Sequence, residues 1–109
     1  MAEIWTVSDW SIGDADPDAF VAAFRRFADA ATTLGGAREG MILQDTEDLA
    51  HFVVLRRWDD ETVVDRWSHG QRQHADELLS LAPGGGSAAV LTKVADLDPS
   101  AMQTGRGPA

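Results

Sequence analysis

The residues best suited to chemistry in this chain are Trp67, His69 and His74, which lie within one short stretch. The imidazole of histidine has an ordinary pKa near neutrality, so it can take a proton from a substrate at physiological pH. Beside an indole wall in a dry pocket, one of these histidines could serve as a general base. His74 lies four residues before Leu78 in a stretch with helical spacing, which favours His74 over His69 as the inward side chain.

A purely structural interpretation of the same residues stays open. Trp67 would then pack on a neighbouring helix and His69 would lie in a solvent-facing turn, while His74 would form a hydrogen bond at the edge of the core. The sequence is compatible with both interpretations.

A metal centre is a weaker hypothesis. The chain contains three histidines and no cysteine. His69 and His74 are five residues apart, whereas two metal ligands on one helical face are four apart. The acidic residues at 59–61 and 47–48 are expected to cap a helix and to form a turn instead. We therefore predict no metal site.

Charged and aromatic side chains on the predicted strands and helices indicate a binding pocket. Arg56 shares a strand face with Phe52, so we expect it to point inward, where it could bind a carboxylate or phenolate. An ion pair with an acidic residue, most simply across a subunit interface, is the alternative role. Aromatic walls suit a flat ligand, and we expect Trp10, Phe24 and Phe52 to line the pocket.

The overall composition disfavours several partners. Eighteen acidic and nine basic residues give a net charge of −9, which argues against binding nucleic acid or an anionic membrane. No segment is apolar over the roughly 20 residues of a membrane helix. The absence of cysteine fits a reducing compartment, and we expect a cytoplasmic protein. The 109 residues suffice for one domain, expected at residues 1–97, with a flexible tail at residues 98–109.

Hydrophobic spacing predicts four strands and three helices. The strands are expected at residues 3–12, 38–45, 51–58 and 87–95. One helix should begin after Asp16 at Pro17 and end at Gly35–Gly36, and two shorter helices should follow the third strand, separated at Gly70. The order βαββααβ is typical of a ferredoxin-like α+β fold, in which helices cover one face of an antiparallel sheet.

The predicted sheet has apolar residues on both faces. In the first strand, Trp5 and Trp10 fall on opposite faces, so neither face is expected to be fully hydrated. Helices can cover one face, and a second copy of the chain is the simplest cover for the other. We therefore expect a homodimer that buries more than roughly 1,200 Å² in total, with a small cavity between helices and sheet in each subunit.

Two stretches carry a family resemblance. Residues 36–48 read G-A-R-E-G-M-I-L-Q-D-T-E-D, and residues 52–67 read F-V-V-L-R-R-W-D-D-E-T-V-V-D-R-W. They resemble the antibiotic biosynthesis monooxygenase superfamily over about residues 3–95. The resemblance implies a dimeric α/β barrel with a pocket in each subunit. Some relatives oxygenate polycyclic aromatic polyketides without metal, flavin or haem, and others degrade haem; we expect no cofactor here.

Individual residues match the family pattern in part. Trp67 corresponds to a helix-borne Trp that lines the pocket, and His74 is a counterpart of a haem-ligating His at a shorter spacing. The family's Asn on the first strand is absent, with Ser8 or Thr6 nearest to its place, and the chain has no Tyr either. The resemblance predicts a cofactor-independent monooxygenase of an aromatic or polyketide-like molecule, with His74 as base and Trp67, Ser8 and His69 in the pocket. A non-catalytic small-molecule-binding dimer and a haem-degrading monooxygenase are the alternatives.

Overall fold

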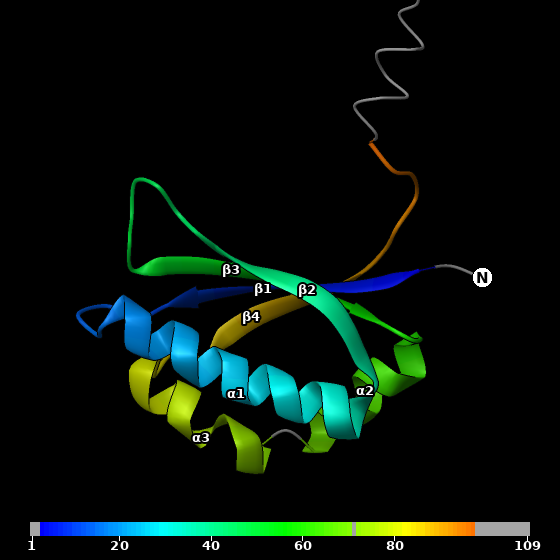
Figure 1. The fold of residues 1–109 in the computed structure, drawn as a ribbon, viewed down its shortest axis with the longest axis horizontal. Coiled ribbons are helices and arrows are strands. Elements are labelled where there is room, and N and C mark those ends of the chain that lie inside the picture. Colours follow the sequence, from blue (N-terminus) through cyan, green and yellow to red (C-terminus); the bar gives the residue numbers. More distant parts are fainter. Residues whose placement is uncertain (1–2, 71, 98–109) are drawn as a thin grey trace, which may run out of the picture.

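The computed structural model describes residues 3–70 and 72–97, which form a four-stranded antiparallel sheet with three helices on one face (Figure 1). The strands lie in the order β2-β3-β1-β4. This arrangement confirms the predicted ferredoxin-like α+β fold. The elements follow the chain in the order β1 (Ile4–Ser11), α1 (Pro17–Gly35), β2 (Ala37–Gln44), β3 (His51–Trp58), α2 (Glu61–Gly70), α3 (Arg72–Leu81) and β4 (Gly86–Thr92).

The observed strands differ from the predicted ones mainly at the end of β4. The sequence pattern continued to residue 95, whereas β4 ends at Thr92, which pairs with Ile4, the first residue of β1; just beyond, the backbone N–H of Lys93 donates to the carbonyl of Glu3 (2.8 Å). The expected flexible tail at residues 98–109 lies outside the described residues, and so does Gln71, the expected start of the last helix.

α1 forms one wall of the protein interior. The side chain of Asp16 caps the helix by accepting from the backbone N–H of Asp18 (3.2 Å), and Pro17 occupies the first turn. Gly36 ends the helix with a left-handed φ of 76°, a conformation that glycine adopts without strain. Between these ends, the face toward the sheet carries four buried residues at helical spacing: Phe20, Ala23, Phe24 and Ala31.

The register of the sheet decides which side chains face the helices. β1 and β3 run antiparallel with Thr6 opposite Arg56 and Ser8 opposite Val54. Because side chains alternate along a strand, all four lie on the helix-covered face. This face therefore combines two hydroxyl groups and a guanidinium group with apolar side chains.

The core is divided into two clusters of buried side chains. One forms around Phe20 and Leu78, where α1 and α3 meet the sheet. The other forms around Trp58 and Trp67, where α1 and α2 meet the sheet. Phe27 on α1 is partly buried and packs against both clusters. The interior is therefore filled at two places, with α1 running over both.

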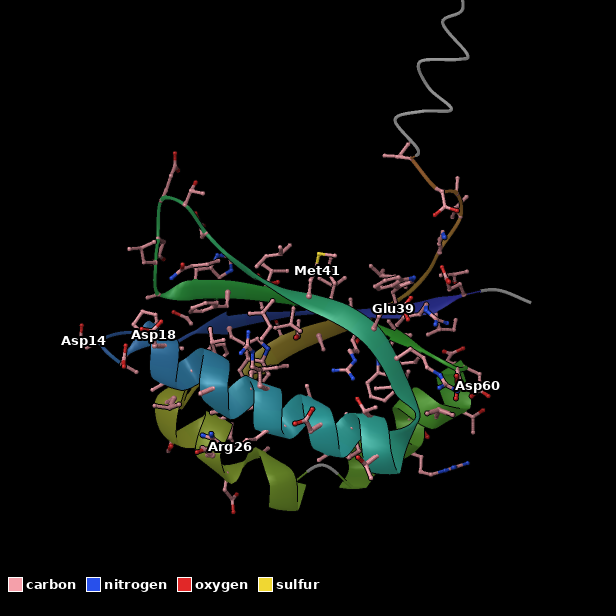
Figure 2. The ribbon with its side chains drawn as sticks, in the orientation of Figure 1. Asp14, Asp18, Arg26, Glu39, Met41 and Asp60 are labelled. Atoms are coloured by element: carbon pink, nitrogen blue, oxygen red, sulfur yellow. The ribbon has the colours of Figure 1, made fainter. Side chains whose placement is uncertain are left out.

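The sheet face away from the helices carries apolar side chains that are partly exposed. Met41, Leu43 and Leu91 expose 50%, 45% and 48% of their surface. Figure 2 shows Met41 on the side of β2 that faces away from the helices. A small sheet with one open apolar face is the feature from which the homodimer is predicted, and the dimer stays a prediction.

Candidate functional site

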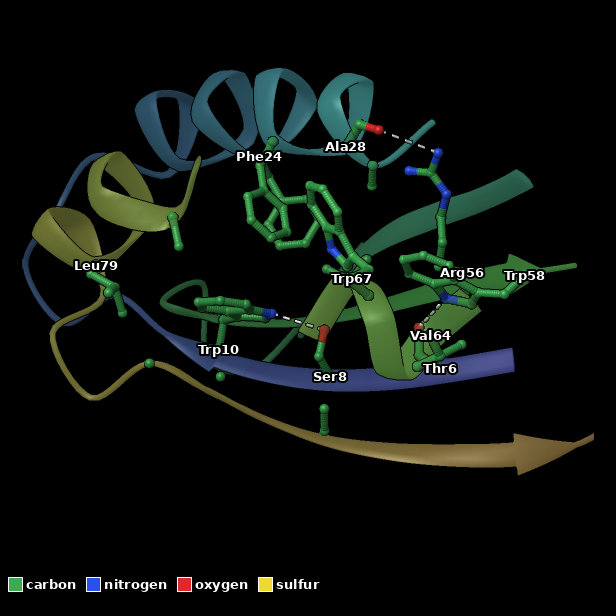
Figure 3. Close-up of a pocket in the computed structure, with 17 residues that line it drawn as sticks. Thr6, Ser8, Trp10, Phe24, Ala28, Arg56, Trp58, Val64, Trp67 and Leu79 are labelled. Carbon is green, nitrogen blue, oxygen red and sulfur yellow. Dashed lines mark hydrogen bonds between the residues drawn. The ribbon is translucent and has the colours of Figure 1, made fainter. Parts of the chain in front are cut away.

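A cavity of about 550 Å³ lies between the helices and the sheet (Figure 3). Its lining draws on both core clusters, since Phe24 and Val54 belong to the first cluster and Trp58 and Trp67 to the second. The cavity therefore occupies the space between the two clusters. A hollow of this volume can hold a small organic molecule.

The sheet side of the cavity carries two hydroxyl groups that are each paired with an indole. The indole N–H of Trp10 donates to the Ser8 hydroxyl (2.9 Å), and the indole N–H of Trp58 donates to the Thr6 hydroxyl (2.9 Å) (Figure 3). A hydroxyl group can accept and donate at the same time. Because both oxygens already accept from an indole, each hydroxyl keeps its own O–H as a donor for a further acceptor.

The helix side of the cavity is a series of aromatic rings. The ring of Phe27 lies 5.5 Å, centroid to centroid, from the ring of Phe24 and 5.5 Å from that of Trp67. Phe24 lies 5.5 Å from Trp10 in an edge-to-face arrangement, which connects α1 to the sheet. Such walls favour a flat, conjugated ligand.

Arg56 lies at one end of the cavity (Figure 3). Its Nε donates to the backbone carbonyl of Arg38, and its Nη2 donates to the Thr32 hydroxyl and to the Ala28 carbonyl (3.4 Å). Alternation along β3 correctly predicted that Arg56 points inward. Its hydrogen bonds described here lie in α1 and β2 of its own chain, and an ion pair across a subunit interface stays a prediction. Burial lowers the pKa of the Arg56 guanidinium below its ordinary value.

The structure places four of the sequence-predicted pocket residues in the cavity lining: Ser8, Trp10, Phe24 and Trp67. Phe52, also expected there, is 2% exposed and packs in the first core cluster, with its ring 4.8 Å from that of Phe20. It borders a different hollow, on the side of α1 that faces β2. The reason is that Phe20 fills the space above Phe52, so the cavity begins farther along the sheet.

The two histidines predicted for the site are placed only by their helices. His69 belongs to α2 and His74 to α3. Their side chains lie outside the described part of the structure. The catalytic role of His74 and the pocket role of His69 therefore stay predictions.

The cavity is also lined by residues that sequence reasoning did not assign to the pocket, among them Trp58 and Gly86. The available signal for Trp58 was its position two residues after Arg56, on the same face of β3. Gly86 gave no such signal, because three consecutive glycines indicate a loop. It enters the site because β4 begins at Gly86, opposite Trp10 of β1.

A second group of ionisable side chains lies on the open face of the sheet. The Nε2 atom of His51 lies 2.7 Å from an oxygen of Asp9, and its Nδ1 atom lies 3.2 Å from an oxygen of Asp45. Hydrogen bonds to these two carboxylates raise the pKa of His51 above its ordinary value. Within residues 3–70 and 72–97, no group of three or more His, Asp or Glu side chains could hold a metal ion. None of the helices in these residues has the length and hydrophobicity required to cross a bilayer.

Comparison with known proteins finds similar structures, whereas no family model and no curated protein matches. SnoaB, a cofactor-independent oxygenase from Streptomyces nogalater, has a TM-score of 0.76 at 20% identity, over 89% of this chain and 98% of SnoaB. A Bordetella bronchiseptica protein that carries the antibiotic biosynthesis monooxygenase name has a TM-score of 0.74 at 12% identity, over 87% and 100% of the two chains. A protein of the same name from Nitrosomonas europaea has a TM-score of 0.71 at 14% identity, over 88% and 94%.

A SnoaB mutant in which an asparagine is replaced by alanine also matches, with a TM-score of 0.75 at 21% identity over 87% and 96% of the chains. The present chain contains no asparagine, so its side chain at that place is a different one. At these identities the likeness concerns the fold. The resemblance predicted from residues 36–67 is thus confirmed in three dimensions: this chain has the fold of the antibiotic biosynthesis monooxygenases.

Proposed function

We propose that this protein is a cofactor-independent monooxygenase that acts on a small aromatic or polyketide-like molecule. The observation that carries the proposal is the cavity of about 550 Å³, whose walls include Trp10, Phe24, Phe27, Trp58 and Trp67. SnoaB has the same fold and is a cofactor-independent oxygenase, which supports the proposed class of reaction.

An anthrone is a simple substrate that suits such a cavity. Oxidation of its central CH₂ group to a carbonyl consumes one O₂, because one oxygen atom enters the substrate carbon and the other leaves as water with the two hydrogens. The substrate itself supplies the electrons once that carbon has lost a proton. The protein then has to orient the rings, exclude bulk water and accept the proton.

We assign the wall to Trp67 and the proton-accepting role to His74. Trp67 is 8% exposed and lies against Phe27, so it can hold one face of a flat ligand in place. Leu78 of α3 is fully buried, and His74 stands four positions before it on the same helix. Helical spacing of four puts the two positions on the same side of α3.

Oxygen uptake with dithranol, an anthrone, tests this function. We expect uptake above the rate of dithranol autoxidation, with one molecule of the anthraquinone formed per O₂ consumed. Dialysis against a metal chelator should leave the rate unchanged. Uptake equal to that in buffer, or uptake that appears only after flavin or a metal is added, would contradict the proposal.

A ligand-binding protein without catalysis is the second candidate. It is favoured by one observation: the described residues that line the cavity include no Asp, Glu or His, and therefore no carboxylate or imidazole base. This candidate predicts that dithranol quenches tryptophan fluorescence on binding while no product forms under air. Haem degradation, the third alternative, predicts a shift of the Soret band when haemin is added.

A further inference from the structure

The polar side chains that line the cavity are all hydrogen-bond donors toward a ligand. Ser8 and Thr6 each accept from an indole and keep an O–H to donate. Arg56, the third polar group, is a donor by chemistry. Among the lining residues that the structure describes, no carboxylate or carboxamide side chain offers an acceptor. Although each hydroxyl oxygen keeps a second lone pair, the guanidinium group can only donate, so a ligand that meets Arg56 must supply an acceptor atom.

Among the described residues, no carboxylate forms a close ion pair with Arg56, and Asp29 and Glu39 act on its charge only from farther away. Its hydrogen bonds go to two backbone carbonyls and one hydroxyl, which are all neutral. Other arginines in the chain pair with carboxylates: Arg26 with Glu77 at 2.6 Å, Arg38 with Asp59 at 2.6 Å and Arg57 with Glu39 at 2.7 Å. The chain has eighteen acidic residues, so the absence of a close ion pair in the described part of the structure does not reflect a shortage of acids.

The hydrogen bonds of Arg56 leave one edge of the guanidinium group available. Nε and Nη2 are engaged by Arg38, Thr32 and Ala28, whereas both N–H groups of Nη1 are left to donate. In Figure 3, the terminal nitrogen without a dashed line is turned toward Trp67. The contacts with α1 and β2 thus hold the side chain in place and direct its remaining donors to the aromatic side of the cavity.

Arg56 and Thr6 form one row of the sheet. They lie directly opposite each other in the β1–β3 ladder, on the helix-covered face. Directly opposed residues of an antiparallel pair have Cα atoms about 4.5–5.5 Å apart. The side chain of Arg56 nevertheless extends away from the sheet to α1, whereas the Thr6 hydroxyl stays on the sheet beside Trp58, so the two groups meet different parts of the cavity (Figure 3).

We propose that the cavity binds its aromatic ligand as a conjugated oxyanion, a phenolate or an enolate, with the oxygen held by Arg56 Nη1. A delocalised oxyanion is weakly hydrated compared with a carboxylate, so it loses less when it enters an apolar cavity. Charge-assisted hydrogen bonds to the half-buried guanidinium offset that loss. The inference rests on the proposed function for the ring character of the ligand, and it adds Arg56 as the residue that selects the charge state.

Alizarin, a dihydroxyanthraquinone that changes colour when it ionises, is a direct probe. We expect the wild-type protein to bind the phenolate about tenfold more tightly than the phenol, so that bound alizarin ionises about one pH unit below the free dye. The dimethyl ether of alizarin cannot ionise. It reports the aromatic contribution alone, through quenching of tryptophan fluorescence.

The variant R56Q should abolish this preference and leave binding of the dimethyl ether within about twofold of wild type. The matched control is R57Q, because Arg57 is the next residue of β3, points to the opposite face and pairs with Glu39. R57Q should keep the wild-type preference. R56K, which retains the charge without the planar fork, should keep part of it.

The outcomes separate the two proposals. An R56Q protein that still prefers the phenolate overturns the inference while the aromatic pocket stands. A wild-type protein that binds only the neutral dye also overturns the inference and leaves the aromatic pocket standing. This measurement needs no variant, so it is decisive even if R56Q does not fold. A protein that binds neither alizarin nor its dimethyl ether overturns the proposed function together with the inference.

Discussion

The indole ring of Trp10 lies against the backbone of Gly86, its partner across the β1–β4 ladder. A Cβ atom at position 86 would fall 2.7 Å from Cζ2 of this ring and closer still to Cε2. Real Cβ atoms essentially never approach other atoms so closely. Glycine is therefore what allows the ring to extend over β4 and to reach the Ser8 hydroxyl at 2.9 Å.

Replacing Gly86 with alanine should displace Trp10 and destabilise the protein. The cost of such overpacking is about 1–3 kcal/mol, and the displaced ring should also weaken dithranol binding. Gly84→Ala is the matched control, because a Cβ atom there meets no atom within 4 Å. Urea unfolding followed by tryptophan fluorescence measures both variants, and equal stabilities would show that the contact with Trp10 is unimportant.

The hydrogen bond between Trp58 and Thr6 should appear as a coupling energy. In a double-mutant cycle of Trp58→Phe and Thr6→Val, we expect about 0.5–1.5 kcal/mol of non-additive stability. The control cycle pairs Trp58→Phe with Ser8→Ala, which share no hydrogen bond, and should be additive within about 0.5 kcal/mol. Coupling of similar size in the two cycles would argue against the specific bond.

The pKa of His51 should lie above its ordinary value, because hydrogen bonds to Asp9 and Asp45 favour the protonated ring. A raised pKa in the folded state means that this contribution to stability is fully present below the unfolded pKa of about 6.5. It is lost as the pH rises through the folded pKa. NMR titration of the His51 ring should show the raised pKa in wild type and a lower one in Asp9→Asn.

The stabilising contribution of protonated His51 should also appear in unfolding measurements, and it should decrease as the pH rises. The difference in unfolding midpoint between wild type and His51→Gln should be larger near pH 6 than near pH 9, where the imidazole is neutral. A difference that grows with pH would reverse the expected sign and contradict the raised pKa.

The open sheet face should hold two copies of the chain together. Sedimentation at micromolar concentration is expected to give twice the chain mass of 11.7 kDa. Leu43→Glu should shift the protein to the monomer, because it places a charge on the apolar face. Leu49→Glu is the control, since Leu49 is 61% exposed in the loop between β2 and β3. A folded monomeric wild type would disprove the dimer.

Removal of the proposed base should slow turnover without loss of binding. We expect His74→Ala to lower the rate of dithranol oxidation by about 100-fold or more, the usual contribution of a general base. His51→Ala removes an imidazole on the other face of the sheet and should change the rate by less than about twofold. Full turnover in His74→Ala would show that His74 is not the base. Another group would then accept the proton, or the substrate would be acidic enough to lose it without a base from the protein.

The local elements could be predicted from the sequence because their signals are local. Asp16, Pro17 and Gly36 mark the ends of α1, and alternation along β3 places Arg56 on the covered face. These features depend on backbone geometry and on residues a few positions apart.

The residues that line the cavity could not be predicted in the same way. Whether Phe52 or Trp58 meets empty space depends on which helix residue lies above it, and Phe20 decides this for Phe52. The role of Gly86 depends on pairing with a strand 76 positions earlier, at Trp10. Such relations arise only when the whole sheet and its helices are assembled.

The division of the core into two clusters has a thermodynamic consequence. The space between them is bordered by Phe24 and Val54 on one side and by Trp58 and Trp67 on the other. A flat ligand in that space would pack against both clusters at once and fill the gap that no side chain fills. Occupancy and folding are thus linked, so the melting temperature should climb with ligand concentration.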